Sequence, residues 1–157
     1  MLVKNILLLL VKKQALFLEF ERYTNLLAVC DDEFIDNYIT KRTDVANEID
    51  NVTDQISSLA KTAIVTPPID SILSNSCNFS EVPSQWQAIF LEAQKIKGTI
   101  SRCIEANYHA LERMIALRDH LKERIVQNNN TPRIIKYIST SGALQQETNI
   151  NMKNTQI

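Results

Sequence analysis

Hydrophobic residues recur at alternating steps of three and four along three long segments of the chain. The stripe is clearest in the third segment, which begins near residue 84 and runs to about residue 127. Its positions are Trp86, Ile89, Ala93, Ile96, Ile100, Cys103, Asn107, Ala110, Met114, Leu117 and Leu121. This spacing keeps a narrow stripe on one side of a helix, and such a stripe is stable when another helix covers it. The pattern predicts helices packed against helices.

The two earlier segments, about residues 2–30 and 32–64, carry the same rhythm. Lys13 interrupts the first, and Arg42 occupies one seam position of the second. The run Asp31-Asp32-Glu33 between them favours a helix cap or a tight turn, because acidic side chains suit the start of a helix. A bend without a break is the alternative, since the rhythm passes on to Phe34. The apolar positions are Ile6, Leu9, Leu16, Phe20, Tyr23, Leu27 and Cys30, then Ile35, Tyr38, Val45, Ile49, Val52, Ile56, Leu59 and Ala63.

Prolines mark the ends of these segments. Thr66-Pro67-Pro68 ends the second, because proline lacks the backbone donor and disfavours the helical region for the preceding residue. Residues 67–83 form a connector in which Ile69, Ile72, Leu73 and Phe79 suit a short turn of helix across the bundle. Ser84 is the expected cap of the third helix. Gly98 inside that helix predicts a close crossing by a neighbouring helix.

The periodicity ends at Asn128-Asn129-Asn130-Thr131-Pro132, and residues 128–157 are polar apart from one apolar island. That island holds Ile134, Ile135, Tyr137 and Ile138, with Gly142 shortly after. It either packs back on the bundle or folds on a partner. The expected fold is all-α: an elongated, coiled-coil-like antiparallel bundle of three long helices over residues 1–127, followed by a flexible C-terminal tail over residues 128–157.

Composition and charge narrow the class of protein. Two glycines and four prolines in 157 residues are too few turn signals for a sheet protein. Seventeen basic residues balance 18 acidic ones without a basic cluster, so no nucleic-acid partner is expected. The apolar run Ile6–Val11 is far shorter than the roughly 20 residues that span a bilayer, so no stable membrane insertion is expected. Three widely spaced cysteines suit reduced thiols in the cytoplasm.

Candidate catalytic or metal-binding chemistry is sparse. His109 and His120 lie eleven residues apart, roughly 16 Å along one helix, and so cannot share a metal or a proton. Cys103 and His109 fall on different sides of that helix, which fails as a nucleophile–base pair. No enzyme activity, metal or cofactor is therefore expected. Asn107 in the seam is either an amide that sets helix register or a polar contact to a partner.

Three features resemble the FlgN family of flagellar export chaperones. The first is a leading helix with Phe17, Phe20 and Tyr23 before Leu26-Leu27, and the second is a long helix over residues 33–61 after an acidic turn. The third is a long C-terminal helix containing residues 104–111 (IEANYHAL), followed by a polar linker and the aromatic-plus-glycine segment 136–142 (KYISTSG). One departure is Lys61, where family members often carry an arginine at the end of the second helix.

The resemblance implies a cytoplasmic chaperone without ATPase activity. Such proteins bind the C-terminal helices of hook-associated flagellar proteins, prevent their premature association and deliver them to the export gate. A helix laid into an apolar groove is recognised by anchors at three- and four-residue spacing. The client-binding residues expected here are Asn107, Leu111, Met114, Leu117, Leu121 and Ile125. Ile134, Ile135, Tyr137 and Ile138 are the expected contacts of the tail with the gate or the client.

There are two alternatives to this interpretation. One is a FliT-like chaperone of the filament cap. The other is a structural or regulatory coiled-coil protein that forms a homodimer through the same seam. The residues leave open the identity of the client and whether the free chain is a monomer or a dimer.

Overall fold

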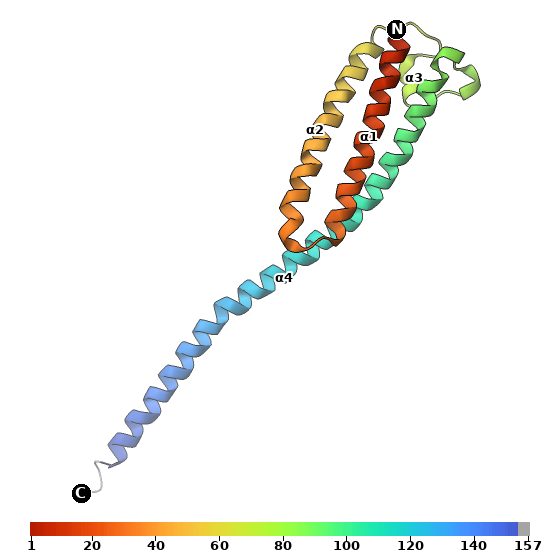
Figure 1. Cartoon of the computed structure of the whole chain (residues 1–157). Helices are drawn as coiled ribbons and strands as arrows, with labels where there is room; N and C mark the ends of the chain where they lie inside the picture. Colours follow the sequence, from red (N-terminus) through yellow and green to blue (C-terminus); the bar gives the residue numbers. More distant parts are fainter. Residues whose placement is uncertain (154–157) are drawn as a thin grey trace. The chain divides into compact units, whose positions relative to one another are not determined.

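The computed structural model describes the backbone of residues 1–153 and the side chains of residues 1–129. Every regular element within residues 1–153 is helical, which confirms the all-α prediction (Figure 1). The chain divides into a first unit, Met1–Arg113, and a second unit, Met114–Ile157. The elements in order are α1 (Leu2–Val29), η1 (Asp32–Phe34), α2 (Ile35–Ala60), α3 (Ile69–Leu73), η2 (Phe79–Glu81), η3 (Ser84–Trp86) and α4 (Gln87–Lys153).

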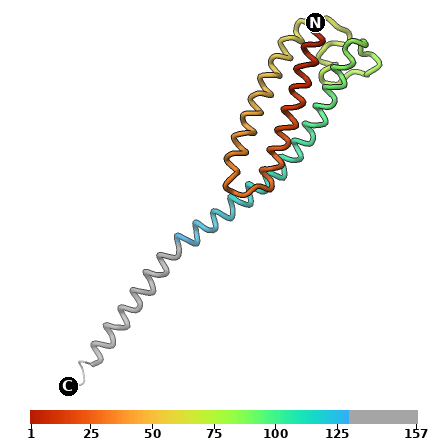
Figure 2. The backbone as a smooth tube through the Cα atoms, viewed as in Figure 1, coloured from red at the N-terminus to blue at the C-terminus, as the bar shows by residue number. Residues whose placement is uncertain are grey.

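The first unit is a bundle of three helices. α1 packs along α2 in the opposite direction, and α4 up to Arg113 runs beside α1 (Figures 1 and 2). The 28 residues of α1 make it about 42 Å long at 1.5 Å per residue. Gln14 on α1 ties the helices together by donating a hydrogen bond from Nε2 to Thr99 Oγ1 on α4, at 2.9 Å.

The core of this unit is built from the predicted stripes. On α4 the stripe from Trp86 to Ile96 is buried as expected, and so is Cys103. Below Cys103 the buried positions are Ala106 and Ala110 rather than Asn107. These two small side chains lie on the bundle side of the helix, while Asn107 is exposed. The core cluster consists of Ile6, Leu10, Val52, Ile56, Ala60, Ile69, Ile72, Val82, Trp86, Ile89, Phe90 and Ile96.

The connection between α1 and α2 is a true break. Cys30 and Asp31 adopt extended backbone conformations before η1 begins. No side chain caps η1 or α2 through a hydrogen bond, so the expected acidic cap does not form. Instead, Asp32 Oδ1 lies 3.2 Å from Arg113 Nη2. The acidic cluster marks a tight turn, and part of its charge is compensated by α4.

The connector contains the short helix expected from its apolar residues. Ile69 and Ile72 of α3 are buried in the core. Asn75, at a positive φ of 53°, donates from Nδ2 to the backbone oxygen of Phe90 at 2.9 Å. Phe79 packs against Phe90 with ring centroids 5.6 Å apart. The connector is therefore anchored on the first turns of α4.

Two local predictions for the third helix are wrong. Ser84 does not cap α4, because it lies inside the 3₁₀ turn η3, whose first position is preceded by Pro83. Trp86 N donates to the Pro83 oxygen at 2.7 Å in that turn. Gly98 marks no close helix crossing either, since a Cβ added there would meet nothing within 4 Å. The glycine is exposed and faces away from the bundle.

The third helix also ends later than expected. The prediction placed its end near Gln127, but the backbone of α4 is helical to Lys153. A proline within a helix removes one N–H donor and can kink the helix without ending it. The prediction that the third helix ends before Pro132 is therefore wrong. The first side chains of the predicted tail, at Asn128 and Asn129, are exposed.

Candidate binding surfaces on α4

In the first unit, α4 carries a second apolar stripe on the face away from the bundle. Ile104, Tyr108 and Leu111 are each more than half exposed. Steps of four and three residues place them on one side of the helix. Cys103, whose neighbours on its own stripe are Ala106 and Ala110, occupies the opposite, buried side. One apolar stripe of this helix thus stabilises the fold, and the other is open to solvent.

In the second unit, the described side chains of α4 include several exposed large hydrophobic residues. Leu121, Ile125 and Val126 are 47%, 59% and 58% exposed. Leu121 and Ile125 lie one turn apart on the same face. Met114 and Leu117, also expected in the client-binding stripe, are half-buried. Among the predicted residues, Leu111, Leu121 and Ile125 therefore offer the most apolar surface.

Asn107 is engaged within the first unit. Its Oδ1 accepts a hydrogen bond from Arg42 Nη2 at 2.9 Å, across 65 residues of sequence. The Arg42 guanidinium also lies over the Phe20 ring, 4.8 Å from its centroid. Burial lowers the pKa of Arg42. The two polar residues that interrupted the seams of α2 and α4 are therefore partners of each other, with an aromatic ring of α1 beside them.

The groups with catalytic potential are not assembled into a site in the described part of the chain. His109 Nδ1 lies 3.7 Å from Glu112 Oε2, and both side chains are well exposed. No cluster of three His, Cys, Asp or Glu side chains in that part is placed to hold a metal ion. Cys103 is buried, and its Sγ donates to the Phe17 oxygen at 3.5 Å. Burial raises the pKa of this thiol, which favours the unreactive protonated form.

The sequence pattern did not identify one exposed apolar surface, which lies on α1. Leu8, Val11 and Leu18 on α1 are about half exposed, and Val29 more so. Leu8, Val11, Ala15 and Leu18 also follow steps of three and four, so the signal was present. The first ten residues are apolar on nearly every side, and the rhythm alone does not say which of two stripes faces the bundle.

The tail residues Ile134, Ile135, Tyr137 and Ile138 have side chains outside the described residues. Within the described part of the chain, no helix is both long enough and apolar enough to cross a membrane. A comparison with protein-family models, with curated proteins and with solved structures gives no match for this chain.

Proposed function

We propose that this chain is a cytoplasmic chaperone of the FlgN type, which binds the C-terminal helices of hook-associated flagellar proteins and delivers them to the export gate. The observation that carries the proposal is the exposed apolar surface of α4 in the second unit, formed by Leu121, Ile125 and Val126. The resemblance in residues 104–111 and 136–142 supplies the identity of the client.

An amphipathic client helix suits this surface physically. Its apolar face carries anchors at steps of three and four residues, which match the one-turn spacing of Leu121 and Ile125. Burying a leucine or isoleucine that is otherwise exposed contributes about 1.5–3 kcal/mol. Two or three such anchors therefore support a complex that forms and releases, as a delivery chaperone needs.

The charged residues around these anchors favour recognition without a strong net field. Arg118 pairs with the adjacent Asp119, with Nη2 and Oδ1 2.9 Å apart. Lys122, Glu123 and Arg124 follow between the anchors and are exposed. A rim of mixed charge sets register and orientation more than affinity.

The contributions of the individual residues are expected to differ. Leu121 and Ile125 are the main client anchors, and Leu111 offers a separate exposed position in the first unit. Met114 and Leu117 have less surface to lose. Asn107 is expected to act mainly through Arg42, because its amide oxygen already accepts that hydrogen bond. Tyr137, with the isoleucines around it, is the proposed contact to the gate or the client.

A coiled-coil homodimer is the second candidate, because the same exposed residues could cover one another in two copies. The chaperone and homodimer hypotheses differ in what buries Leu121 and Ile125. A dimer buries them in the absence of any client, whereas a chaperone leaves them open until the client arrives. A FliT-like chaperone would bind a filament-cap protein at the same surface.

The test replaces Leu121 and Ile125 together by aspartate and measures the affinity for a peptide carrying the C-terminal helix of a hook-associated protein. Loss of two main anchors is expected to weaken binding by about 30-fold or more. The matched control is Leu8→Asp with Leu18→Asp on α1, which changes equally exposed leucines and is expected to leave affinity within about twofold. Unchanged peptide binding by the α4 variant would rule out this surface.

Light scattering on the same proteins separates the alternatives. If the unmodified chain is a dimer that takes up no peptide, and the α4 variant is a monomer, the coiled-coil reading is correct. A peptide from a filament-cap protein that binds more tightly than the hook-associated peptide would favour the FliT-like hypothesis.

A separate variant tests the tail. Tyr137→Ala is expected to reduce capture of the export gate.

A further inference from the structure

An exposed seam runs along almost the whole length of α1, on the side away from the core. It repeats in steps of three and four residues over nearly four heptads, which is the spacing of a coiled-coil contact. Its positions are Lys4, Leu8, Val11, Ala15, Leu18, Arg22, Asn25 and Val29, and all of them are exposed. The large apolar side chains among them are between 46% and 77% exposed. These eight residues form the outer seam of α1.

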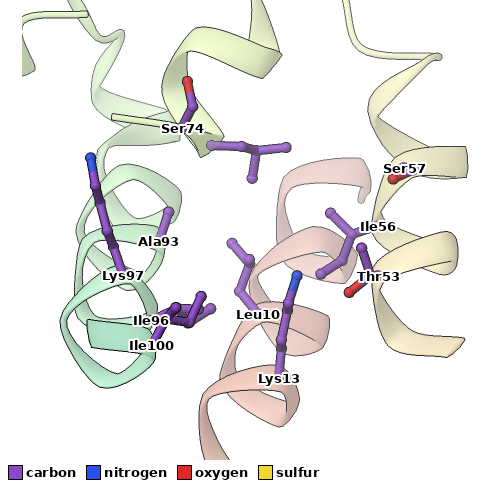
Figure 3. Close-up of a pocket in the computed structure, with 11 residues that line it drawn as sticks. Leu10, Lys13, Thr53, Ile56, Ser57, Ser74, Ala93, Ile96, Lys97 and Ile100 are labelled. Carbon is purple, nitrogen blue, oxygen red and sulfur yellow. The ribbon is translucent and has the colours of Figure 1, made fainter. Parts of the chain in front are cut away.

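The opposite side of α1 is already covered by the fold. Leu10 on that side is 4% exposed, and Lys13 is half-buried and lines the pocket shown in Figure 3. Val11 and Ala15, each two residues from Lys13, project to the other side of the helix. The chain therefore leaves only the outer seam of α1 open, and an exposed apolar surface of this kind is suited to contact with another protein.

The outer seam contains an open hollow near the C-terminal end of α1. The hollow is lined by Leu18, Glu21, Arg22, Asn25, Leu26 and Val29. These residues form two overlapping sets of four with the spacing i, i+3, i+4, i+7. The first hole consists of residues 18, 21, 22 and 25, and the second hole of residues 22, 25, 26 and 29. Four residues with this spacing form the hole that receives one side chain of a facing helix.

The charged end of Arg22 lies at the edge of this hollow. Its guanidinium is 4.8 Å from the centroid of the Tyr23 ring, and its Nη2 is 3.8 Å from Glu19 Oε1. Tyr23 packs against Tyr38 of α2, with ring centroids 6.2 Å apart, so these contacts hold the guanidinium on the α2 side of the seam. The aliphatic stem of Arg22 then lines the hollow.

We propose that the outer seam of α1 pairs with the same seam of a second copy of this chain, antiparallel, about a two-fold axis between residues 16 and 17. Val11 of the second copy enters the first hole, and its Leu8 enters the second hole. Ala15 faces Leu18 of the second copy at the centre, so a small side chain meets a large one. Each of these contacts occurs twice, because a two-fold contact uses the same surface of both copies.

The charges along the seam favour this pairing over two others. It places Lys4 opposite Val29 of the second copy, and Arg22 opposite Val11. Parallel pairing would set Lys4 against Lys4 and Arg22 against Arg22. Antiparallel pairing about an axis at residue 13 would set Arg22 against Lys4. Like charges that face each other across a helix contact are unfavourable, so both of these arrangements are disfavoured.

The dimer is expected to be weak. Three of the eight seam positions are polar, and polar residues in such a seam specify register at a cost in stability. At the edge, Lys12 comes close to Glu19 of the second copy. Lys12 already contacts Glu48, and Glu19 accepts a hydrogen bond from Tyr23 Oη at 3.0 Å, so this contact adds orientation more than affinity. A dissociation constant on the order of 10–100 μM is expected.

This inference does not depend on the proposed chaperone function. The contact uses residues of α1, whereas the homodimer considered above would bury Leu121 and Ile125 of α4. The variant that carries aspartate in place of both Leu121 and Ile125 is therefore expected to dimerise through α1 as the unmodified chain does.

The first test measures the mass of the full-length chain by sedimentation equilibrium between about 5 and 500 μM. The unmodified chain is expected to shift from monomer to dimer over this range. Leu18→Asp lies at the centre of the contact in both copies and is expected to weaken dimerisation by about 30-fold or more. Leu91→Asp on α4 is the matched control, because Leu91 and Leu18 are both 46% exposed. A monomer at every concentration, or an equal effect of the two variants, would overturn the proposal.

Disulfide trapping tests the orientation of the two helices. The half-buried thiols of Cys30 and Cys77 are first replaced by serine, while Cys103 is buried and stays. Chains with Ala15→Cys and chains with Leu18→Cys are then mixed and oxidised. The mixed disulfide is expected to exceed the Ala15→Cys self-disulfide by about fivefold or more, because only the antiparallel pairing brings these two positions opposite each other. A predominant self-disulfide of Ala15→Cys would show parallel pairing and contradict the proposal.

Discussion

Arg113 on α4 donates a hydrogen bond from Nη1 to the backbone oxygen of Leu27, at 2.6 Å, where α1 ends. Its Nη2 donates to the backbone oxygen of Cys30 and to Asp32 Oδ1. The last carbonyl groups of a helix have no partner within the helix, and an arginine can satisfy two of them with its planar fork. One side chain at the end of the first unit thus closes α1 and holds the turn into α2.

Replacing Arg113 by methionine is expected to destabilise the first unit by about 2 kcal/mol, because hydrogen bonds from a charged group to part-buried carbonyls are lost together. Arg113→Lys is expected to recover only part of this loss, since an ammonium lacks the fork. The measurement is urea unfolding followed by the fluorescence of Trp86, which is the single tryptophan and lies in the core. Arg118→Met, which removes an exposed arginine, is the control and should shift stability by less than about 0.5 kcal/mol. Equal effects of the two methionine variants would contradict the role of Arg113.

Gly98→Ala is expected to stabilise the first unit by about 0.5–1 kcal/mol. A glycine inside a helix loses more backbone entropy on folding than alanine, and the added methyl group meets no atom within 4 Å. The same urea titration checks it. Ala15→Gly, at an exposed position inside α1, is the reciprocal control and should cost a similar amount. A loss of stability in Gly98→Ala would show that a neighbour approaches this position after all.

The helices were predictable because their apolar residues repeat with the period of a helix over many turns. The short helix α3 was predictable for the same reason on a smaller scale. Ile69 and Ile72 have the spacing of one helical turn, so a turn of helix buries both of them. The sequence also showed the polar residues inside the stripes, but it did not show which residues they contact. Arg42 meets Asn107 across 65 residues, and nothing in the local sequence of either residue specifies that contact.

The candidate site was only partly predictable for a related reason. Periodicity shows that α4 has an apolar stripe, yet small shifts in helix rotation decide which residues face inward. After Cys103 the inward positions are Ala106 and Ala110, so Ile104 and Tyr108 are left outside. Arg113 drew no attention in the sequence, because its function depends on the end of α1 some 80 residues away. The open pocket beside Lys13 likewise depends on residues of α1, α2, α3 and α4 together.

Ile89→Ala is expected to destabilise the first unit by about 2–5 kcal/mol, because a fully buried isoleucine loses its packing and leaves a cavity. Leu91→Ala, two residues along the same helix, is the matched control. Ile89 is 0% exposed and Leu91 is 46% exposed, so the control should cost less than about 1 kcal/mol. Urea unfolding by Trp86 fluorescence measures both. A larger effect at Leu91 than at Ile89 would mean that α4 presents a different face to the bundle.

Lys13→Met is expected to stabilise the free protein at neutral pH, because it removes a half-buried ammonium whose pKa burial has lowered from the ordinary value of 10.5. Below the lowered pKa, both the folded and the unfolded chain carry the charge, and the folded state bears the full unfavourable contribution. Between the lowered pKa and 10.5, the unfolded chain binds more protons than the folded one, so the stability of the unmodified protein rises with pH. The stability advantage of Lys13→Met should therefore be greatest near pH 7 and shrink at alkaline pH.

Urea unfolding of both proteins from pH 7 to about pH 10 checks this prediction. Taking the difference between their free energies of unfolding cancels the titration of groups common to both, Cys103 among them. Lys12→Met, which removes the partner of Glu48, is the control and should bring no gain at pH 7. A variant at Lys13 that is less stable than the unmodified chain at pH 7, or whose advantage does not change with pH, would show that burial of the ammonium is not unfavourable.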